Sequence, residues 1–244
     1  MAAENFHPDY LKVNPMGTVP SLVTPSLPTP LIDSRDILAH LDSLKPSPSL
    51  TPSDAKTKAT MQAIIDLVHG DDVGTNLILL QARDEDELED KRTGPFGAYI
   101  ATRQKVLEKH RAALPEHDFY GPKAEENGML HRNYTTAPPS EREQFFKDTH
   151  KAYSKFAAEM DRLESLLVLP YAVGEDVTLA DLHAAPWLAH ALWGVGTTEI
   201  KDLGKLERHL QKSAPRFVIG PKTQKWWDNY TERATFKEVF PVLH

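Results

Sequence analysis

The residues of this chain that are best placed for chemistry stand at the start of an expected helix. Asp33 and Ser34 follow the apolar pair Leu31-Ile32 and precede a helical pattern that runs to about Leu44, before Pro46. Aspartate and serine at such a position cap helices. A helix start also exposes backbone N–H groups, and together with a serine hydroxyl these groups suit a carboxylate. The sequence therefore predicts that residues 33 and 34 can hold a ligand carboxylate.

A turn and two short strands are expected to position this helix start. Pro15-Met16-Gly17 predicts a turn, because Gly17 can adopt a positive φ at no steric cost. Ser21–Thr24 is then expected as a short strand and Leu31-Ile32 as a second strand. The proline-rich segment 25–30 separates the two.

These elements resemble the glutathione-binding half of a glutathione S-transferase. The resemblance rests on Asn-Pro-x-Gly-x-Val-Pro at 14–20 and on the acidic-Ser-Arg sequence at 33–35. In that family the Val-Pro peptide bond is cis, and a cis proline is a fixed feature of a tight bend. The resemblance implies that the residue before the cis proline pairs through its backbone with the cysteinyl part of glutathione. It also implies that the acidic-Ser pair holds the γ-glutamyl end. The implied glutathione-binding residues are Val19, Pro20, Asp33 and Ser34.

The catalytic residue that is usual in this family is not expected ahead of the turn. The family's thioredoxin-like domain begins with a strand, a helix and a second strand, and a catalytic Tyr, Ser or Cys follows the first strand. Here Ala2 to Val13 precede the turn, and Phe6 to Lys12 can supply the end of the connecting helix. We therefore expect a truncated thioredoxin-like part, and the group that activates the thiol stays unassigned. His7 and Lys12 are the nearest candidates for meeting the glycyl carboxylate, and neither aligns with the family's basic residue.

Composition limits the classes of function. The net charge of −7 argues against nucleic acid and against an anionic membrane surface as partners. There is no cysteine, which excludes disulfides, thiolate metal sites and cysteine nucleophiles. No signal-peptide pattern is found at the N-terminus, and no stretch approaches the ~20 apolar residues that cross a bilayer. We therefore expect a cytoplasmic protein that does not enter a membrane.

The fold class expected from the pattern and the resemblance is α+β and mostly α. A truncated thioredoxin-like part is expected at 1–45, a linker at 46–53 because of its Pro and Ser content, and an all-α C-terminal domain at 54–244. The segment 113–140 is expected to be a loop-like insertion, because Pro and Gly residues interrupt its periodicity. It could cover a cleft or be a mobile surface loop, and the sequence leaves both open.

Apolar periodicity predicts helices after the linker. They are expected over Ala55–Val68, over Tyr99–Arg111, around Leu203 to Leu210, and as a last helix marked by Trp226, Trp227, Tyr230 and Phe236. The acidic run 84–87 is expected as a solvated helix end or loop.

Two further helix starts carry the capping-box pattern. Ser140-Glu141-Arg142-Glu143 precedes the strongest periodic pattern of the chain. Thr178 is expected to be an N-cap to which Asp181 bonds back. Thr-x-Ala-Asp at this place resembles the folding-critical cap in the C-terminal domain of the transferase family.

A second substrate would, by the resemblance, lie between the domains against the first long helices of the all-helical part. Four polar residues are expected to face it, with ordinary surface or interhelix contacts as the alternative: Asp72, Asn76, Tyr99 and Arg103. The chain has 11 histidines, but no His-x-x-x-His or Glu-x-x-His pattern lies on an expected helix. We therefore expect no dedicated metal site.

The resemblance implies a homodimeric, glutathione-dependent enzyme that acts on a small, hydrophobic, unsaturated electrophile. The thiolate of bound glutathione would be the nucleophile. Either the adduct persists as a conjugate, or the thiol adds to a conjugated double bond, permits rotation and leaves, which gives cis-trans isomerisation. The middle segment and the Pro-rich turns resemble fungal members that act on specialised metabolites. A non-catalytic scaffold or regulatory domain remains the alternative.

Overall fold

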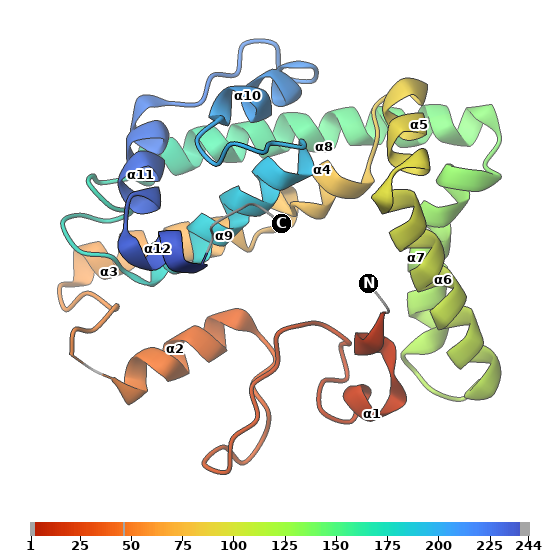
Figure 1. Ribbon diagram of the computed structural model, residues 1–244, viewed down its shortest axis with the longest axis horizontal. Coiled ribbons are helices and arrows are strands. Elements are labelled where there is room, and N and C mark those ends of the chain that lie inside the picture. Colours follow the sequence, from red (N-terminus) through yellow and green to blue (C-terminus); the bar gives the residue numbers. More distant parts are fainter. Residues whose placement is uncertain (1–2, 46, 240–244) are drawn as a thin grey trace. The chain divides into compact units, whose positions relative to one another are not determined.

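The computed structural model describes residues 3–45 and 47–239, and these residues are mainly helical (Figure 1). Within this described part, β structure is limited to two isolated bridges. The chain is therefore mostly α, as predicted.

Two compact units make up the chain. The first consists of the residues up to Leu41 together with Ala82–Lys147, and the second of Asp42–Gln81 together with the residues from Asp148 onward. Each unit thus combines two separate stretches of the chain, whereas each predicted domain is one continuous stretch. The predicted domain boundaries at residues 45 and 54 stay a prediction.

The first unit contains the N-terminal segment and a helical hairpin. Its elements are η1 (Glu4–Phe6, a 3-10 helix), α1 (Pro8–Leu11), most of α2 (Ser34–Leu44), α5 (Glu85–Thr93), α6 (Pro95–Ala113), α7 (Tyr120–Thr135) and the first part of α8 (Pro139–Leu166). Helices α6 and α7 pack against each other and form the hairpin, and α5 packs against α6.

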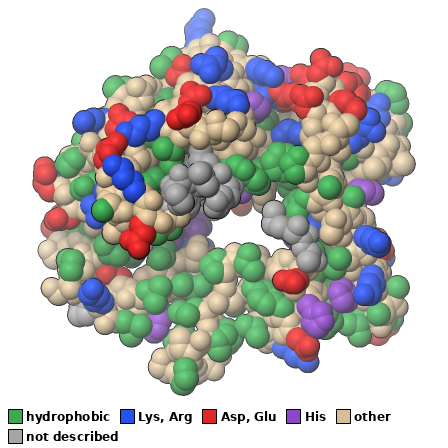
Figure 2. All heavy atoms as spheres, in the orientation of Figure 1, with side chains coloured by type: hydrophobic (Ala, Val, Ile, Leu, Met, Phe, Trp, Pro, Cys, Tyr) green, Lys and Arg blue, Asp and Glu red, His purple; other side chains and the backbone are tan. Residues whose placement is uncertain are grey.

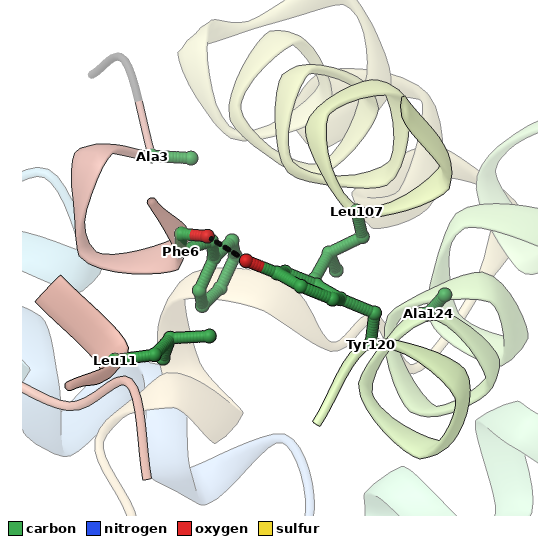
Figure 3. Close-up of a cluster of buried hydrophobic side chains, with 6 residues drawn as sticks. All are labelled: Ala3, Phe6, Leu11, Leu107, Tyr120 and Ala124. Atoms are coloured by element: carbon green, nitrogen blue, oxygen red, sulfur yellow. Dashed lines mark hydrogen bonds between the residues drawn. The ribbon is translucent and has the colours of Figure 1, made fainter. Parts of the chain in front are cut away.

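A cluster of buried apolar side chains fastens the N-terminal segment to this hairpin. Phe6 and Leu11 belong to the same cluster as Leu107 of α6 and Tyr120 of α7 (Figure 3). The Tyr120 hydroxyl donates to the carbonyl oxygen of Phe6 at 2.9 Å, which gives a buried phenol the partner it needs. Burial raises the pKa of Tyr120, so the phenol stays protonated and remains a donor.

The segment 113–140 is helical over most of its length, so the expectation of an irregular loop is wrong. Helix α7 begins at Tyr120, which puts Pro122 in the first turn, where a missing N–H breaks no helical hydrogen bond. Gly128 lies inside the helix at a close approach, because a Cβ atom there would lie 3.4 Å from Nε2 of Gln104. These residues mark a helix start and a helix contact, which the sequence pattern alone did not distinguish from a loop.

The two predicted strands shorten to one residue pair. Leu22 and Leu31 form an isolated antiparallel bridge, with N–O distances of 2.8 Å and 3.0 Å. Two strands alone are marginal, and the prolines between them cannot donate hydrogen bonds. The strands predicted over 21–24 and 31–32 are therefore wrong in extent.

The second unit is built around α3 and α9, which pack against each other. Its elements are α3 (Ala55–Val68), η2 (Asp71–Val73), α4 (Asn76–Leu80), the remainder of α8, α9 (Leu179–Gly194), α10 (Leu203–Gln211), α11 (Pro221–Thr231) and α12 (Ala234–Val239). The helices predicted at 55–68 and 203–210 are confirmed. The aromatic residues expected on one last helix are divided between α11 and α12.

Helix α9 begins with the predicted capping box. One oxygen of the Asp181 carboxylate accepts from the backbone N–H of Thr178 at 2.9 Å and from its hydroxyl at 3.2 Å. The other oxygen accepts from the N–H of Ala172 at 2.8 Å and from the indole N–H of Trp226 at 2.9 Å. Burial raises the pKa of the Asp181 carboxyl, and the four hydrogen bonds oppose that shift. The cap therefore ties three segments of the second unit together.

The capping box predicted at Ser140 is wrong. Helix α8 begins at Pro139, so Ser140 lies in the first turn and cannot be the N-cap. Proline is favoured at the first helical position, which explains the earlier start. Glu143 pairs with Lys147 at 2.6 Å instead of bonding back to Ser140.

The acidic run 84–87 is a helix end, one of the two possibilities predicted. The Asp84 side chain caps α5 by accepting from the N–H of Glu87 at 2.8 Å. Figure 2 shows acidic side chains gathered over this helix. Helix α6 starts at Pro95, four residues before the start predicted at Tyr99.

Candidate functional site

The peptide bond between Val19 and Pro20 is cis, as predicted. Val19 is 70% exposed. Among the residues that the structure describes, none hydrogen-bonds to the backbone of Val19. The bend therefore presents an open backbone segment on the surface of the first unit.

Side chains on both sides of the bend hold it in place. Asn14 is fully buried, and its Nδ2 donates to the carbonyl oxygen of Thr18 at 2.8 Å and to the Ser21 hydroxyl at 3.1 Å. The Tyr10 hydroxyl donates to the same carbonyl oxygen of Thr18. Neither Tyr10 nor Asn14 was predicted to be a positioning residue. The place of Asn14 directly before a Pro-x-Gly turn was the one sequence feature that indicated its role. No sequence feature indicated a role for Tyr10.

The turn that leads into the bend requires glycine. Gly17 has a φ of +61°, and a Cβ atom there would lie 2.6 Å from Cζ of Phe119. The side-chain amide of Asn5 donates to the carbonyl oxygen of Gly17 at 2.6 Å. The turn is thus fixed by its own backbone conformation, by a ring from the hairpin and by an amide from η1.

Asp33 and Ser34 lie at the N-terminal end of α2, as the helix prediction requires. The Asp33 carboxylate accepts from the backbone N–H of Arg35 at 2.8 Å and from its guanidinium at 3.2 Å and 3.3 Å. Both side chains are close to half exposed, so this ion pair stabilises the fold little. Arg35 is a neighbour of the site that the sequence analysis left without a role, and only its place two residues after Asp33 signals the contact.

The Leu22–Leu31 bridge relates the bend to the start of α2. Pro20 lies two residues before Leu22, and Asp33 lies two residues after Leu31. The bridge thus holds the segment that follows the bend beside the segment that leads into α2.

Tyr99 and Arg103 pair with each other on α6, within the same unit. The guanidinium of Arg103 donates to the Tyr99 hydroxyl at 2.9 Å. Its central carbon lies 4.4 Å from the centroid of the Phe6 ring, a cation–π distance. Both residues therefore have structural partners in the first unit, and their role toward a second substrate stays a prediction.

Asp72 and Asn76 belong to the second unit. Asp72 accepts from Lys155 at 2.9 Å on the surface, and this bond raises the pKa of Lys155. Asn76 is exposed at the start of α4. The four residues predicted to face a second substrate are thus divided between the two units, and a cleft that they share stays a prediction.

Two general findings accompany this site. Within residues 3–45 and 47–239, no group of three His, Asp or Glu side chains could hold a metal ion. None of the helices in these same residues has the length and apolar character that a membrane span needs.

Sequence comparisons link the N-terminal part to a known family. Residues 3–49 match the family model described as glutathione S-transferase, N-terminal domain. The chain is 31% identical over 110 residues to glutathione S-transferase Z1 from Arabidopsis thaliana, which covers 45% of this chain and 49% of that protein. The chain therefore spans about half the length of this curated relative.

Two solved structures have similar folds. Beta-etherase LigF from Sphingobium matches with a TM-score of 0.56 at 19% identity, over 98% of this chain and 84% of that one. A glutathione transferase homologue from Sulfitobacter, solved with bound glutathione, matches with a TM-score of 0.47 at 20% identity, over 97% of this chain and 79% of that one. The likeness to the first of these shows a shared fold.

Proposed function

We propose, from the premise that this chain belongs to the glutathione S-transferase family, that it is a glutathione-dependent enzyme. Its glutathione site would be the cis bend at Val19–Pro20 and the start of α2 at Asp33 and Ser34. The observation that supports this assignment most is the Leu22–Leu31 bridge, which lies two residues from Pro20 and two residues from Asp33.

The chemistry of these residues fits the two ends of a γ-glutamyl peptide. The exposed Val19 backbone offers an N–H and a carbonyl to the peptide backbone of a ligand. The first turn of α2 offers N–H groups without helical partners, and the Ser34 hydroxyl adds a donor, so a carboxylate is favoured there. The Asp33 carboxylate suits an ammonium group.

Arg35 would share Asp33 with the ligand. Its guanidinium bonds to the carboxylate are long and solvent-exposed, so an ammonium group can join or replace them at small cost. Arg35 also brings a positive charge to the start of α2, which favours the ligand carboxylate.

Glutathione, when bound, supplies the thiol nucleophile. The second substrate would be a small, hydrophobic, unsaturated electrophile, and the outcome would be a conjugate or a cis-trans isomer. Tyr99 and Arg103 are the proposed polar contacts of that substrate from the first unit, and Asp72 and Asn76 those from the second. We also propose a homodimer, and a place in fungal specialised metabolism.

Calorimetric titration with glutathione tests the site. Asp33→Ala and Ser34→Ala should each weaken binding about ten-fold or more, because a charge-assisted hydrogen bond contributes ~1.5–3 kcal/mol. Asp36→Ala is the matched control, since it removes an exposed carboxylate from the same helix turn. If the parent does not bind glutathione, the alternative of a non-catalytic scaffold or regulatory domain is favoured. If the Asp33 and Ser34 variants bind as tightly as the parent, the residue assignment is wrong.

A further inference from the structure

A groove of about 650 Å³ lies in the first unit, between the Pro15-Met16 turn and the segment that leads into α7. Its volume is in the range of small-molecule sites. None of the four proposed glutathione-binding residues lines it. The groove is thus a separate feature that the proposed function leaves unused.

One side of the groove is apolar and held in place. Pro15, Met16, Phe119 and Pro122 form it. Met16 is 64% exposed, so its side chain is accessible to a ligand. The Phe119 ring is held between Phe6, at a centroid distance of 5.6 Å, and the glycine of the turn. The Phe119 ring of this wall is therefore held in place by other residues of the first unit.

The rim of the groove is acidic. Glu116, Asp118 and Glu126 face one ammonium group, that of Lys123, which gives a net charge of −2. Lys123 pairs with Glu126 at 2.7 Å. Glu116 and Asp118 are exposed and make no ion pair or hydrogen bond with any described residue. These two carboxylates without an ion-pair partner are separated in the sequence by one residue, His117.

We propose that this groove binds a small apolar organic cation of the arylalkyl-ammonium class. The apolar part lies against Met16 and Phe119, and the ammonium group lies between Glu116 and Asp118. Attraction of the cation to the face of Phe119 would add to these contacts. The proposal goes beyond the glutathione-dependent activity and does not rest on it.

Three probes with the same phenyl ring and four methylene groups, which differ only in their head group, test the proposal by calorimetry at low salt: 4-phenylbutylamine, 4-phenylbutanol and 5-phenylpentanoate. The amine should bind tightest and the carboxylate weakest. Each exposed ion pair contributes up to ~1 kcal/mol, or about five-fold in affinity, so the amine should bind about ten-fold tighter than the carboxylate. Equal affinities for the three probes, or binding of none, would overturn the proposal.

Variants distinguish the contribution of the carboxylates to binding from that of the apolar wall. Glu116→Gln combined with Asp118→Asn should weaken the amine about five-fold or more and leave the alcohol unchanged. Met16→Gln should weaken all three probes alike. Glu125→Gln is the control, because Glu125 is exposed on α7, shortly after the loop with Glu116 and Asp118, pairs with Arg111 at 3.5 Å and does not line the groove. A loss of amine affinity in this control equal to that of the double variant would also overturn the proposal.

Discussion

Asn14 in the first unit and Asp181 in the second are both fully buried polar side chains that hold a bend of the chain. Asn14 is neutral, and its hydrogen bonds go to a loop whose outer side is exposed at Val19. Asp181 is a carboxyl group, and its partners include the buried indole of Trp226. The first network holds an exposed bend, which is the proposed ligand-binding segment, and the second fixes the start of a central helix. Damage to the first should therefore appear in binding, and damage to the second in global stability.

Asp181→Ala should have the largest effect on stability. Four donors would lose their acceptor inside the second unit, which should lower the free energy of unfolding by about 3–5 kcal/mol. Urea unfolding followed by tryptophan fluorescence measures this, because all four tryptophans lie in the second unit. Asp176→Ala, at an exposed neighbour, is the control. If the two variants unfold at the same urea concentration, the buried network does not stabilise the fold.

Asn14→Ala should act locally. The bend would lose three donor contacts of the Asn14 amide and the acceptor of the Met16 N–H, a cost of about 1–3 kcal/mol. Hydrogen exchange at the Met16 amide should accelerate, and glutathione should bind more weakly. Tryptophan-detected unfolding should change little. A shift of global unfolding as large as that of Asp181→Ala would remove the contrast between the two networks.

Thr178→Ala should cost about 1 kcal/mol, the usual loss for an N-cap. Thr178→Ser keeps the hydroxyl and should restore most of the stability in the same urea titration. An Ala variant as stable as the parent would mean that Asp181 alone fixes the start of α9.

His190 should make the second unit sensitive to acid. Burial lowers the pKa of this imidazole, which meets the Thr75 hydroxyl at 2.6 Å. An unfolded histidine has a pKa of about 6.5, so below that pH the unfolded chain binds more protons and the free energy of unfolding falls. His190→Gln should flatten this dependence between about pH 7 and pH 5. An unchanged slope in urea titrations across that range would contradict the assignment.

Much of this architecture could be predicted where a local signal and the tertiary structure agree. The cis bend at Val19–Pro20, the helix start at Asp33 and the cap at Thr178 each follow from a short motif. Helix α7 could not be predicted, because Pro122 and Gly128 are the residues that usually mark loops. Their helical roles depend on Pro122 lying in the first turn and on the approach of Gln104, and neither is visible in the local pattern.

The cis bond at Val19–Pro20 and the place of Asp33 and Ser34 at the start of α2 were predicted, while their role in binding stays a prediction. Asn14 and Arg35 make contacts that depend on the folded loop and on the exposed pair at the start of α2. Tyr99 and Arg103 carried a polar pattern that fits a substrate contact and an intrahelical pair equally well. Spacing on a helix identifies a face, but it does not say what covers that face.

The central claim is that the cis bend and the start of α2 form one glutathione site. Titration of isotope-labelled protein with glutathione, followed in amide spectra, tests it most directly. The account predicts that the amides of Val19 and Ser34 shift together with one dissociation constant, and that cysteinylglycine, which lacks the γ-glutamyl group, shifts Val19 but not Ser34. Glutathione-dependent shifts that leave both amides unchanged would contradict the account.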